Sequence, residues 1–131
     1  MLFRHSHFVT GFPGFIASRL VEKLADRETQ FFLLVQPQFV EKAMAEVEDI
    51  AEATGTPLEC FVLVEGDITL PKLGIPDADL ETMQHEVTDV FHLAAAYDLA
   101  VPKDLAFRVN YEGTKNVNDF VHTVRRLHRY N

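Results

Sequence analysis

The segment Thr10-Gly11-Phe12-Pro13-Gly14-Phe15-Ile16-Ala17 joins a short apolar run to an amphipathic one. The residues before it, Phe8 to Thr10, are typical of the end of a buried strand, and a turn rich in Gly and Pro follows. From Phe15 to about Arg27 the apolar side chains recur on one face at helical spacing, with charged residues opposite. The segment therefore predicts a strand, a tight turn and a helix that starts directly after the turn.

The small residues of this turn suit the binding of a dinucleotide. In a strand-turn-helix unit the pyrophosphate meets the positive end of the helix. Gly11 would let the chain turn sharply, Gly14 would let the backbone approach the phosphates, and Ala17 would let the helix pack closely on the sheet. The spacing Gly-x-x-Gly-x-x-Ala alone also fits an ordinary strand-to-helix turn. We predict cofactor contacts from the turn residues, which are Thr10, Gly11, Phe12, Pro13, Gly14, Phe15 and Ile16.

The rest of the chain alternates strands and helices. Continuous apolar runs, typical of strands covered on both faces, occur at 31–35, 60–64 and 89–94. Helical spacing predicts one helix that ends at a left-handed cap on Gly55, a short helix with Asp77 as its N-cap, and a long helix from Lys103 to about His128. This order predicts a Rossmann-type α/β fold, a doubly wound parallel sheet of about four strands flanked by helices. We expect residues 1–131 to form a single NAD(P)-binding domain that is incomplete at its C-terminus.

Four segments, in this order, resemble the extended short-chain dehydrogenase/reductase family. They are the TGxxGFIA segment at 10–17, Gly66-Asp67-Ile68-Thr69, His92-Leu93-Ala94-Ala95-Ala96, and Asn110-Tyr111-Glu112-Gly113-Thr114. The resemblance implies that Asp67, with Ile68 beside it, lies at the adenine. It implies that Leu93, Ala94, Ala95 and Ala96 line the path to the nicotinamide, and that Asn110 is the active-site asparagine.

Within that family, residues 66–75 look most like fatty acyl-CoA reductases and thioester-reductase domains, which pass hydride from a nicotinamide cofactor to an activated acyl group. The family places a catalytic Tyr-x-x-x-Lys pair after a further strand, and we expect this pair to be absent here. The chain alone is then expected to be inactive, because proton donation needs a positioned acid. Two other functions stay open: the binding part of a sugar-nucleotide epimerase or dehydratase, and a non-catalytic NAD(P)-binding module.

The choice between NAD and NADP stays open. Acyl reductases of this kind usually carry an Arg after the second strand to pair with the 2′-phosphate of NADP, whereas this chain has Gln36. An Asp or Glu that would bind the ribose hydroxyls of NAD is also missing there.

Composition limits the possible binding partners of the chain and its cellular compartment. The net charge of −8 disfavours nucleic acid. The basic cluster Arg125, Arg126 and Arg129 is interpreted as the last turn of the long helix, where cations complement the helix dipole. Cys60 is the single cysteine and lies in an apolar run, which fits a reducing cytoplasm. No stretch approaches the roughly 20 apolar residues that cross a membrane.

The histidines do not predict a metal site. His5 and His7 would point to one face of an extended segment, but two ligands without a third or fourth are weak evidence, so no metal is expected. His92 is interpreted as a packed residue that closes the fourth strand, and His85, His122 and His128 as helix-surface residues.

The chain is expected to self-associate. In the predicted strand order the fourth strand lies at an edge of the sheet, and its unpaired backbone groups would be open to another chain. We therefore expect association through that edge or through the helix that follows Lys103.

Overall fold

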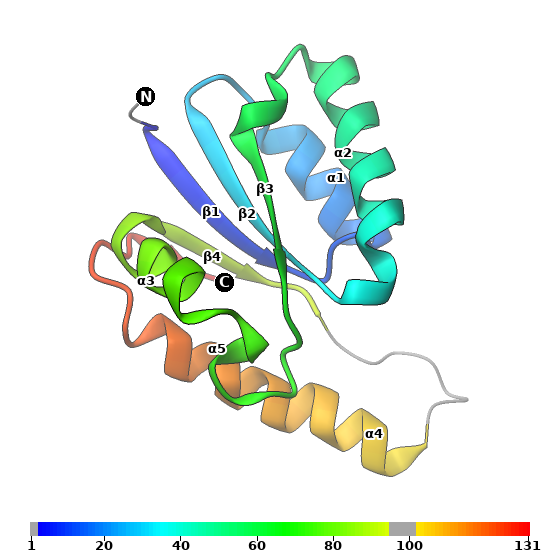
Figure 1. The fold of residues 1–131 in the computed structure, drawn as a ribbon, viewed down its shortest axis with the longest axis vertical. Coiled ribbons are helices and arrows are strands. Elements are labelled where there is room, and N and C mark those ends of the chain that lie inside the picture. Colours follow the sequence, from blue (N-terminus) through cyan, green and yellow to red (C-terminus); the bar gives the residue numbers. More distant parts are fainter. Residues whose placement is uncertain (1–2, 95–101) are drawn as a thin grey trace.

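Five parallel strands form one sheet in the order β3-β2-β1-β4-β5 in the computed structural model, which describes residues 3–94 and 102–131 (Figure 1). The chain leaves β1 for β2 and β3 on one side, then returns to place β4 on the other side. This reversal is the mark of a doubly wound sheet, and it confirms the predicted fold class. The strands are β1 (His5–Thr10), β2 (Thr29–Val35), β3 (Phe61–Glu65), β4 (Asp89–His92) and β5 (Arg129–Tyr130).

Helices cover both faces of the sheet and divide the core into two layers (Figure 1). One layer lies under α1 (Phe15–Leu24) and α2 (Val40–Thr54), and the other under α3 (Asp77–Glu86) and α5 (Gly113–Val121). The central strands are buried on both sides, so their apolar runs are continuous rather than alternating. The remaining short elements are η1 (Pro37–Phe39), η2 (Leu58–Cys60), η3 (Pro71–Gly74), α4 (Lys103–Phe107) and the π-helical turn η4 (Arg108–Glu112).

Helix boundaries were predicted less well than the helices themselves. Gly55 caps α2 in the left-handed conformation, as expected. Helix α1 ends at Leu24, before the predicted Arg27, because the carboxylate of Asp26 accepts a hydrogen bond from the Glu28 amide and shapes the turn into β2. The N-cap of α3 is Pro76, not Asp77, which is the first residue inside the helix.

The helix that follows Lys103 is shorter than predicted. It runs through α4, η4 and α5 and ends at Val121, so the prediction that it reaches His128 is wrong. Val124 and Leu127 continue the helical spacing because they pack on the same core from the loop beyond α5. His122 caps the end of α5, and His128 lies in the loop that follows, so neither is a helix-surface residue.

The basic cluster is also placed differently from the prediction. Arg125 and Arg126 lie in the loop after α5, and Arg129 lies in β5. None of the three sits in the last turn of a helix, so their charges do not complement a helix dipole.

The end of the chain covers the edge of β4. The Asn131 amide donates to the Val90 carbonyl at 2.8 Å, and the His92 amide donates to the Asn131 carbonyl at 2.9 Å. The premise that β4 is an open edge is therefore wrong, because β5 supplies a fifth strand, which the apolar patterning of the sequence does not show.

Among residues 3–94 and 102–131, no helix combines the length and the apolar character needed to span a membrane.

Candidate functional site

The turn between β1 and α1 lies at the carboxyl end of the sheet, beside the end of β4. Gly11 has a φ of +92°. A Cβ at this position would lie 2.9 Å from the carbonyl carbon of Leu93 and 3.0 Å from the amide of Ala94. Gly11 is therefore required both for the turn and for close packing against the segment that leaves β4, at the point where the strand order reverses.

Gly14 is needed for the turn itself. Its φ of −118° suits any residue, but a Cβ would lie 2.5 Å from the Gly11 carbonyl oxygen. The missing side chain thus allows the turn to close on itself. The expected approach of a phosphate to the backbone at Gly14 stays a prediction.

The amino end of α1 is open to an anion. No side chain caps this helix, and its first turn holds no acidic residue. The first backbone N–H groups of a helix have no partner inside it and carry the positive end of the dipole. Ala17 is buried against the sheet and holds the helix close to it, as predicted. The turn and helix therefore fit a dinucleotide pyrophosphate by the backbone donors that the uncapped helix end offers.

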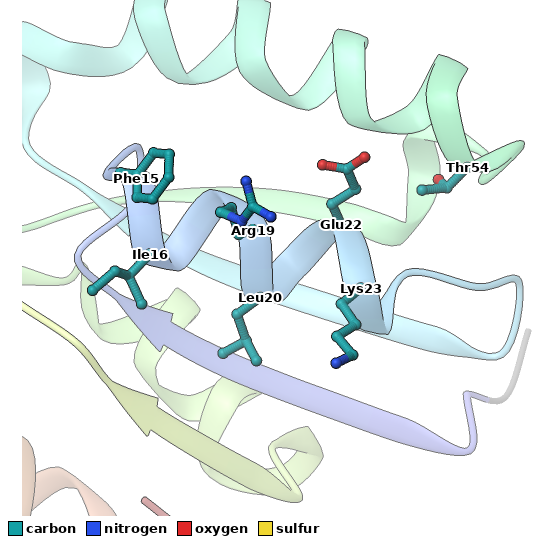
Figure 2. A pocket seen from close by; sticks show the side chains of 7 residues that line it. All are labelled: Phe15, Ile16, Arg19, Leu20, Glu22, Lys23 and Thr54. Carbon is teal, nitrogen blue, oxygen red and sulfur yellow. The ribbon is translucent and has the colours of Figure 1, made fainter.

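Side chains in the turn point in different directions. Phe12 is buried in the core under α1, and its peptide bond to Pro13 is cis. Phe15 and Ile16 are 76% and 65% exposed, at one end of a shallow depression that runs along the outer face of α1 toward Thr54 (Figure 2). Phe12 thus packs inside the molecule, whereas the side chains of Phe15 and Ile16 face the surface.

Thr10 and His92 link the ends of β1 and β4. The Thr10 hydroxyl oxygen accepts hydrogen bonds from the amides of Leu93 at 3.0 Å and Ala94 at 3.1 Å. It lies 2.7 Å from Nδ1 of His92, and because its two lone pairs are occupied, it donates its proton there.

The Thr10 bond sets the tautomer of His92. With Nδ1 as acceptor, the ring proton is on Nε2, which donates to the Thr114 hydroxyl at 3.1 Å. Burial lowers the pKa of His92, which agrees with a neutral ring. His92 closes β4, as predicted, but its hydrogen bonds to β1 and α5 were not predicted; Thr114 in the NxxGT segment was the available signal.

The loop after β3 is held against α5. Asp67 Oδ1 accepts hydrogen bonds from the amide and the hydroxyl of Thr69, at 2.8 and 2.7 Å. Asn116 donates to the Ile68 carbonyl at 2.8 Å. A Cβ on Gly113 would lie 2.5 Å from Cδ1 of Ile68, so this glycine allows close contact between the loop and α5.

The remaining predicted site residues lie around the same edge of the sheet. Gln36 directly follows β2, and its side-chain oxygen accepts a hydrogen bond from Gln38 at 2.8 Å. Asn110 lies in η4, one turn before Thr114 on the helix that faces the end of β4. Ala95 and Ala96 fall outside the described residues. Thr10 at the end of β1 thus contacts Leu93 after β4, and Asp67 follows β3; their roles at a cofactor stay a prediction.

One Tyr-x-x-x-Lys spacing does occur, and it corrects the expectation that the chain has none. Tyr111 and Lys115 have this spacing within the NxxGT segment, which is not where the family carries its catalytic pair. The Tyr111 ring is 61% exposed and stacks on Phe107, while Lys115 forms an ion pair with Asp119 at 3.8 Å. The contacts of both residues are those of an exposed helix.

Comparison with known proteins identifies a family model described as Male sterility protein, an NAD-binding model that matches residues 9–131. Fatty acyl-CoA reductase wat of Drosophila melanogaster is 29% identical over 121 residues, which cover 84% of this chain and 23% of that protein. Fatty acyl-CoA reductase 1 of Arabidopsis thaliana is 29% identical over 132 residues, which cover 86% of this chain and 27% of that protein. The chain thus spans about a quarter of the length of these curated relatives.

Solved structures share the fold. The terminal R domain from the myxalamid PKS-NRPS biosynthetic pathway aligns with a TM-score of 0.73 at 22% identity, covering 96% of this chain and 34% of that one. Gre2 in complex with NADPH from Candida albicans aligns with a TM-score of 0.69 at 21% identity, covering 96% and 36%. At these identities the likeness establishes the Rossmann-type architecture.

Proposed function

The chain belongs to the Male sterility protein family of NAD-binding domains, and from this premise we propose that it is the NAD(P)-binding part of a fatty acyl-CoA or thioester reductase. The observation that carries the proposal is the glycine turn that leads into an uncapped helix end at the reversal of the strand order. The curated relatives, which are named fatty acyl-CoA reductases, favour the acyl substrate over a sugar nucleotide.

We assign the predicted residues to parts of the cofactor as follows. The backbone of residues 10–16 would hold the pyrophosphate, Gln36 would lie toward the adenine ribose, and Asp67 and Ile68 would lie beside the adenine. Leu93 to Ala96 would line the path to the nicotinamide. When bound, the cofactor supplies the hydride that reduces the acyl group. The bonds from Thr69 keep the Asp67 carboxylate in one orientation, which supports its place at the adenine.

Asn110 is our candidate for the active-site asparagine. Thr114, one turn later, contacts His92 at the end of β4, so this helix faces the edge of the sheet where the nicotinamide would lie. Asn110 also lies in a π-helical turn, and such turns are frequent at functional sites.

Binding is tested by calorimetric titration of NADPH and NADH into the full chain. The wild type should bind at least one of them, and the difference between the two measures the preference that Gln36 leaves open. Gly14→Val should abolish binding, because its Cβ would meet the Gly11 carbonyl. Gly55→Ala is the control for a general loss of stability, since the left-handed φ of Gly55 strains an alanine while the residue caps α2 and takes no part in the turn. Equal binding by Gly14→Val and the wild type would contradict the assignment of this turn as the dinucleotide-binding site.

Catalysis is tested on the longest natural polypeptide that contains this chain. With a long-chain acyl-CoA it should oxidise NAD(P)H, and a Gly14→Val version should not. Conversion of a sugar nucleotide instead would favour the epimerase or dehydratase alternative, and binding without any turnover would favour a non-catalytic module.

We also propose self-association, at a site that differs from the expected one. Because β5 covers β4, and Asn131 pairs with β4 through both its amide and its carbonyl, the outward backbone groups on this side of the described sheet belong to Tyr130 of β5. Sedimentation at several concentrations tests this proposal, and Tyr130→Pro, which removes a backbone donor from that edge, should reduce association.

We also propose a reducing cytoplasm as the setting of the protein, in keeping with a single cysteine, Cys60, that is buried as a free thiol.

A further inference from the structure

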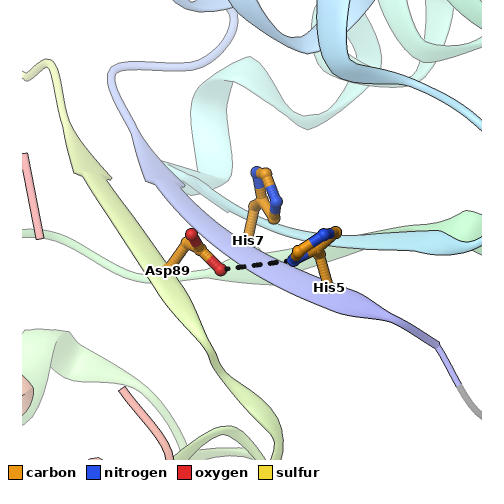
Figure 3. A group of neighbouring side chains, drawn as sticks. All are labelled: His5, His7 and Asp89. Carbon is orange, nitrogen blue, oxygen red and sulfur yellow. Dashed lines mark ion pairs between the residues drawn. The ribbon is translucent and has the colours of Figure 1, made fainter. Parts of the chain in front are cut away.

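A second cluster of polar side chains lies at the opposite end of the sheet from the glycine turn. His5 and His7 lie two residues apart on β1 and therefore point to the same face. Asp89 is the register partner of His7 on β4, so its carboxylate lies on that face as well. Figure 3 shows the three side chains together, with the Asp89 carboxylate directed at the His5 ring.

The three groups are close enough to share one ion. Their potential ligand atoms all lie within 4.8 Å of one another, and His5 Nδ1 is 3.9 Å from Asp89 Oδ1. Ligands of a tetrahedral Zn²⁺ ion, bound at about 2.0–2.2 Å, are separated by roughly 3.3 Å. Binding would thus need the ligand atoms to approach one another by about 1.5 Å at most.

Two ring nitrogens in this cluster lack a hydrogen-bond partner. Nδ1 of His5 and Nδ1 of His7 are buried and unpaired, and the whole of His7 is only 7% exposed. Buried polar atoms without a partner are uncommon in folded proteins and call for an explanation such as an ion. The His7 ring lies against the rings of Phe31 and Phe91, at 5.5 and 5.2 Å between centroids, and these contacts leave its Nδ1 without a hydrogen bond.

The electrostatic influences on His7 are mixed. Burial lowers the pKa of His7. The nearby carboxylates of Asp89 and Asp26 oppose this effect, while His5 and Arg129 add to it. Asp89 also accepts a hydrogen bond from the Thr88 hydroxyl at 2.6 Å, an outer contact of the kind that orients metal-binding carboxylates.

We propose that His5, His7 and Asp89 bind one divalent transition-metal ion, with Zn²⁺ as the test ion, at the amino-terminal end of the sheet. Two imidazoles and one carboxylate form a donor set that Zn²⁺ commonly uses, with a fourth position left for water. The ion would link β1 to β4 through the register partners His7 and Asp89. The cluster is three residues before Thr10 and His92 on its two strands, roughly 10 Å from the glycine turn, so this site is separate from the cofactor site.

The proposal is tested by titrating ZnCl₂ into the tag-free, chelator-stripped full chain without cofactor. The wild type should bind one ion per chain, and the ion should raise its melting temperature. His7→Phe, which keeps an aromatic ring in the core, and Asp89→Asn should each weaken Zn²⁺ binding by more than about tenfold. His85→Gln, on the exposed surface of α3, is the matched control and should bind as the wild type does.

Folding of the variants is checked by circular dichroism. If His7→Phe fails to fold, the partly exposed His5→Gln takes its place, and the same tenfold loss is expected. Co²⁺ provides a second readout, since its visible absorption reports ligation by the protein. Absence of binding to the wild type, or equal binding by the wild type and by every folded variant of the three, would overturn the proposal.

Discussion

The Thr10 hydroxyl donates a hydrogen bond to Nδ1 of His92 at 2.7 Å and ties the ends of two strands whose residues lie 82 positions apart. The same oxygen accepts from the amides of Leu93 and Ala94. One buried hydroxyl therefore positions the start of the segment predicted to line the cofactor path.

Thr10→Val should destabilise the chain by about 1–3 kcal/mol, because buried groups of His92, Leu93 and Ala94 would lose their partner while the side-chain volume stays almost the same. Thr10→Ser keeps the hydroxyl and should be less destabilising. Urea unfolding of the three proteins measures the difference. If the valine variant is as stable as the serine variant, the hydroxyl does not hold the strand ends together.

Ile16→Glu should separate cofactor binding from stability. Ile16 is exposed in the first turn of α1, where a negative charge favours the helix dipole but repels an incoming pyrophosphate. We expect the free energy of unfolding to be unchanged or to rise by up to about 1 kcal/mol while affinity for NADPH falls. The neutral Ile16→Gln is the control for shape. Equal NADPH affinity of the Glu and Gln variants would argue against a phosphate at this helix end.

Gly113→Ala should destabilise the chain despite the better helix propensity of alanine. Alanine is worth about 1 kcal/mol over glycine in a helix, but its Cβ would lie 2.5 Å from Cδ1 of Ile68, and overpacking costs about 1–3 kcal/mol. In the background of Ile68→Ala the space is open, so the same change should stabilise. A double-mutant cycle by urea unfolding measures the coupling. An equal effect of Gly113→Ala on the free energy of unfolding in both backgrounds would show that its contact with Ile68 does not affect stability.

Stability should fall as the pH is lowered through about 6.5. Burial lowers the pKa of both His7 and His92, so the unfolded chain, with an ordinary value of 6.5, binds more protons than the folded one below that pH. The loss of stability continues until the pH falls below the lowered pKa values that the two histidines have in the folded chain. Unfolding curves with a chelator present, from pH about 7.5 to about 5, test this. His7→Phe removes one of the two groups and should make the dependence shallower; a flat wild-type profile would contradict the prediction.

Tyr111→Phe should leave NAD(P)H oxidation by the longest natural polypeptide unchanged. The Tyr111 ring is exposed and stacks on Phe107, and Lys115 pairs with Asp119, so this Tyr-x-x-x-Lys spacing forms no catalytic pair. Lys115→Met is a second variant with the same expectation. The isolated chain should show no turnover with an acyl-CoA. A loss of activity of more than about tenfold in either variant would assign the pair a role in proton transfer.

The sequence by itself determined the order of strands and helices, the glycine turn and the two buried faces, because these depend on residues close together in the chain. Gly11, Gly14 and Ala17 specify a strand-turn-helix unit by spacing alone, and continuous apolar runs specify strands that are covered on both sides. Only the tertiary structure decided where the last helix stops and how residues 122–131 continue from it. Val124 and Leu127 keep a helical spacing after the helix has stopped, because burial, not local conformation, selects their type.

Contacts between distant residues were likewise decided by the tertiary structure. The bond from Thr10 to His92, the contact of Gly113 with Ile68, and the meeting of His5 and His7 with Asp89 each join segments more than 40 residues apart. Spacing along the chain reveals which face a side chain occupies, but only strand register reveals which side chain lies beside it. For this reason the sequence shows two histidines on one face, and the third member of their cluster appears only when β4 pairs with β1.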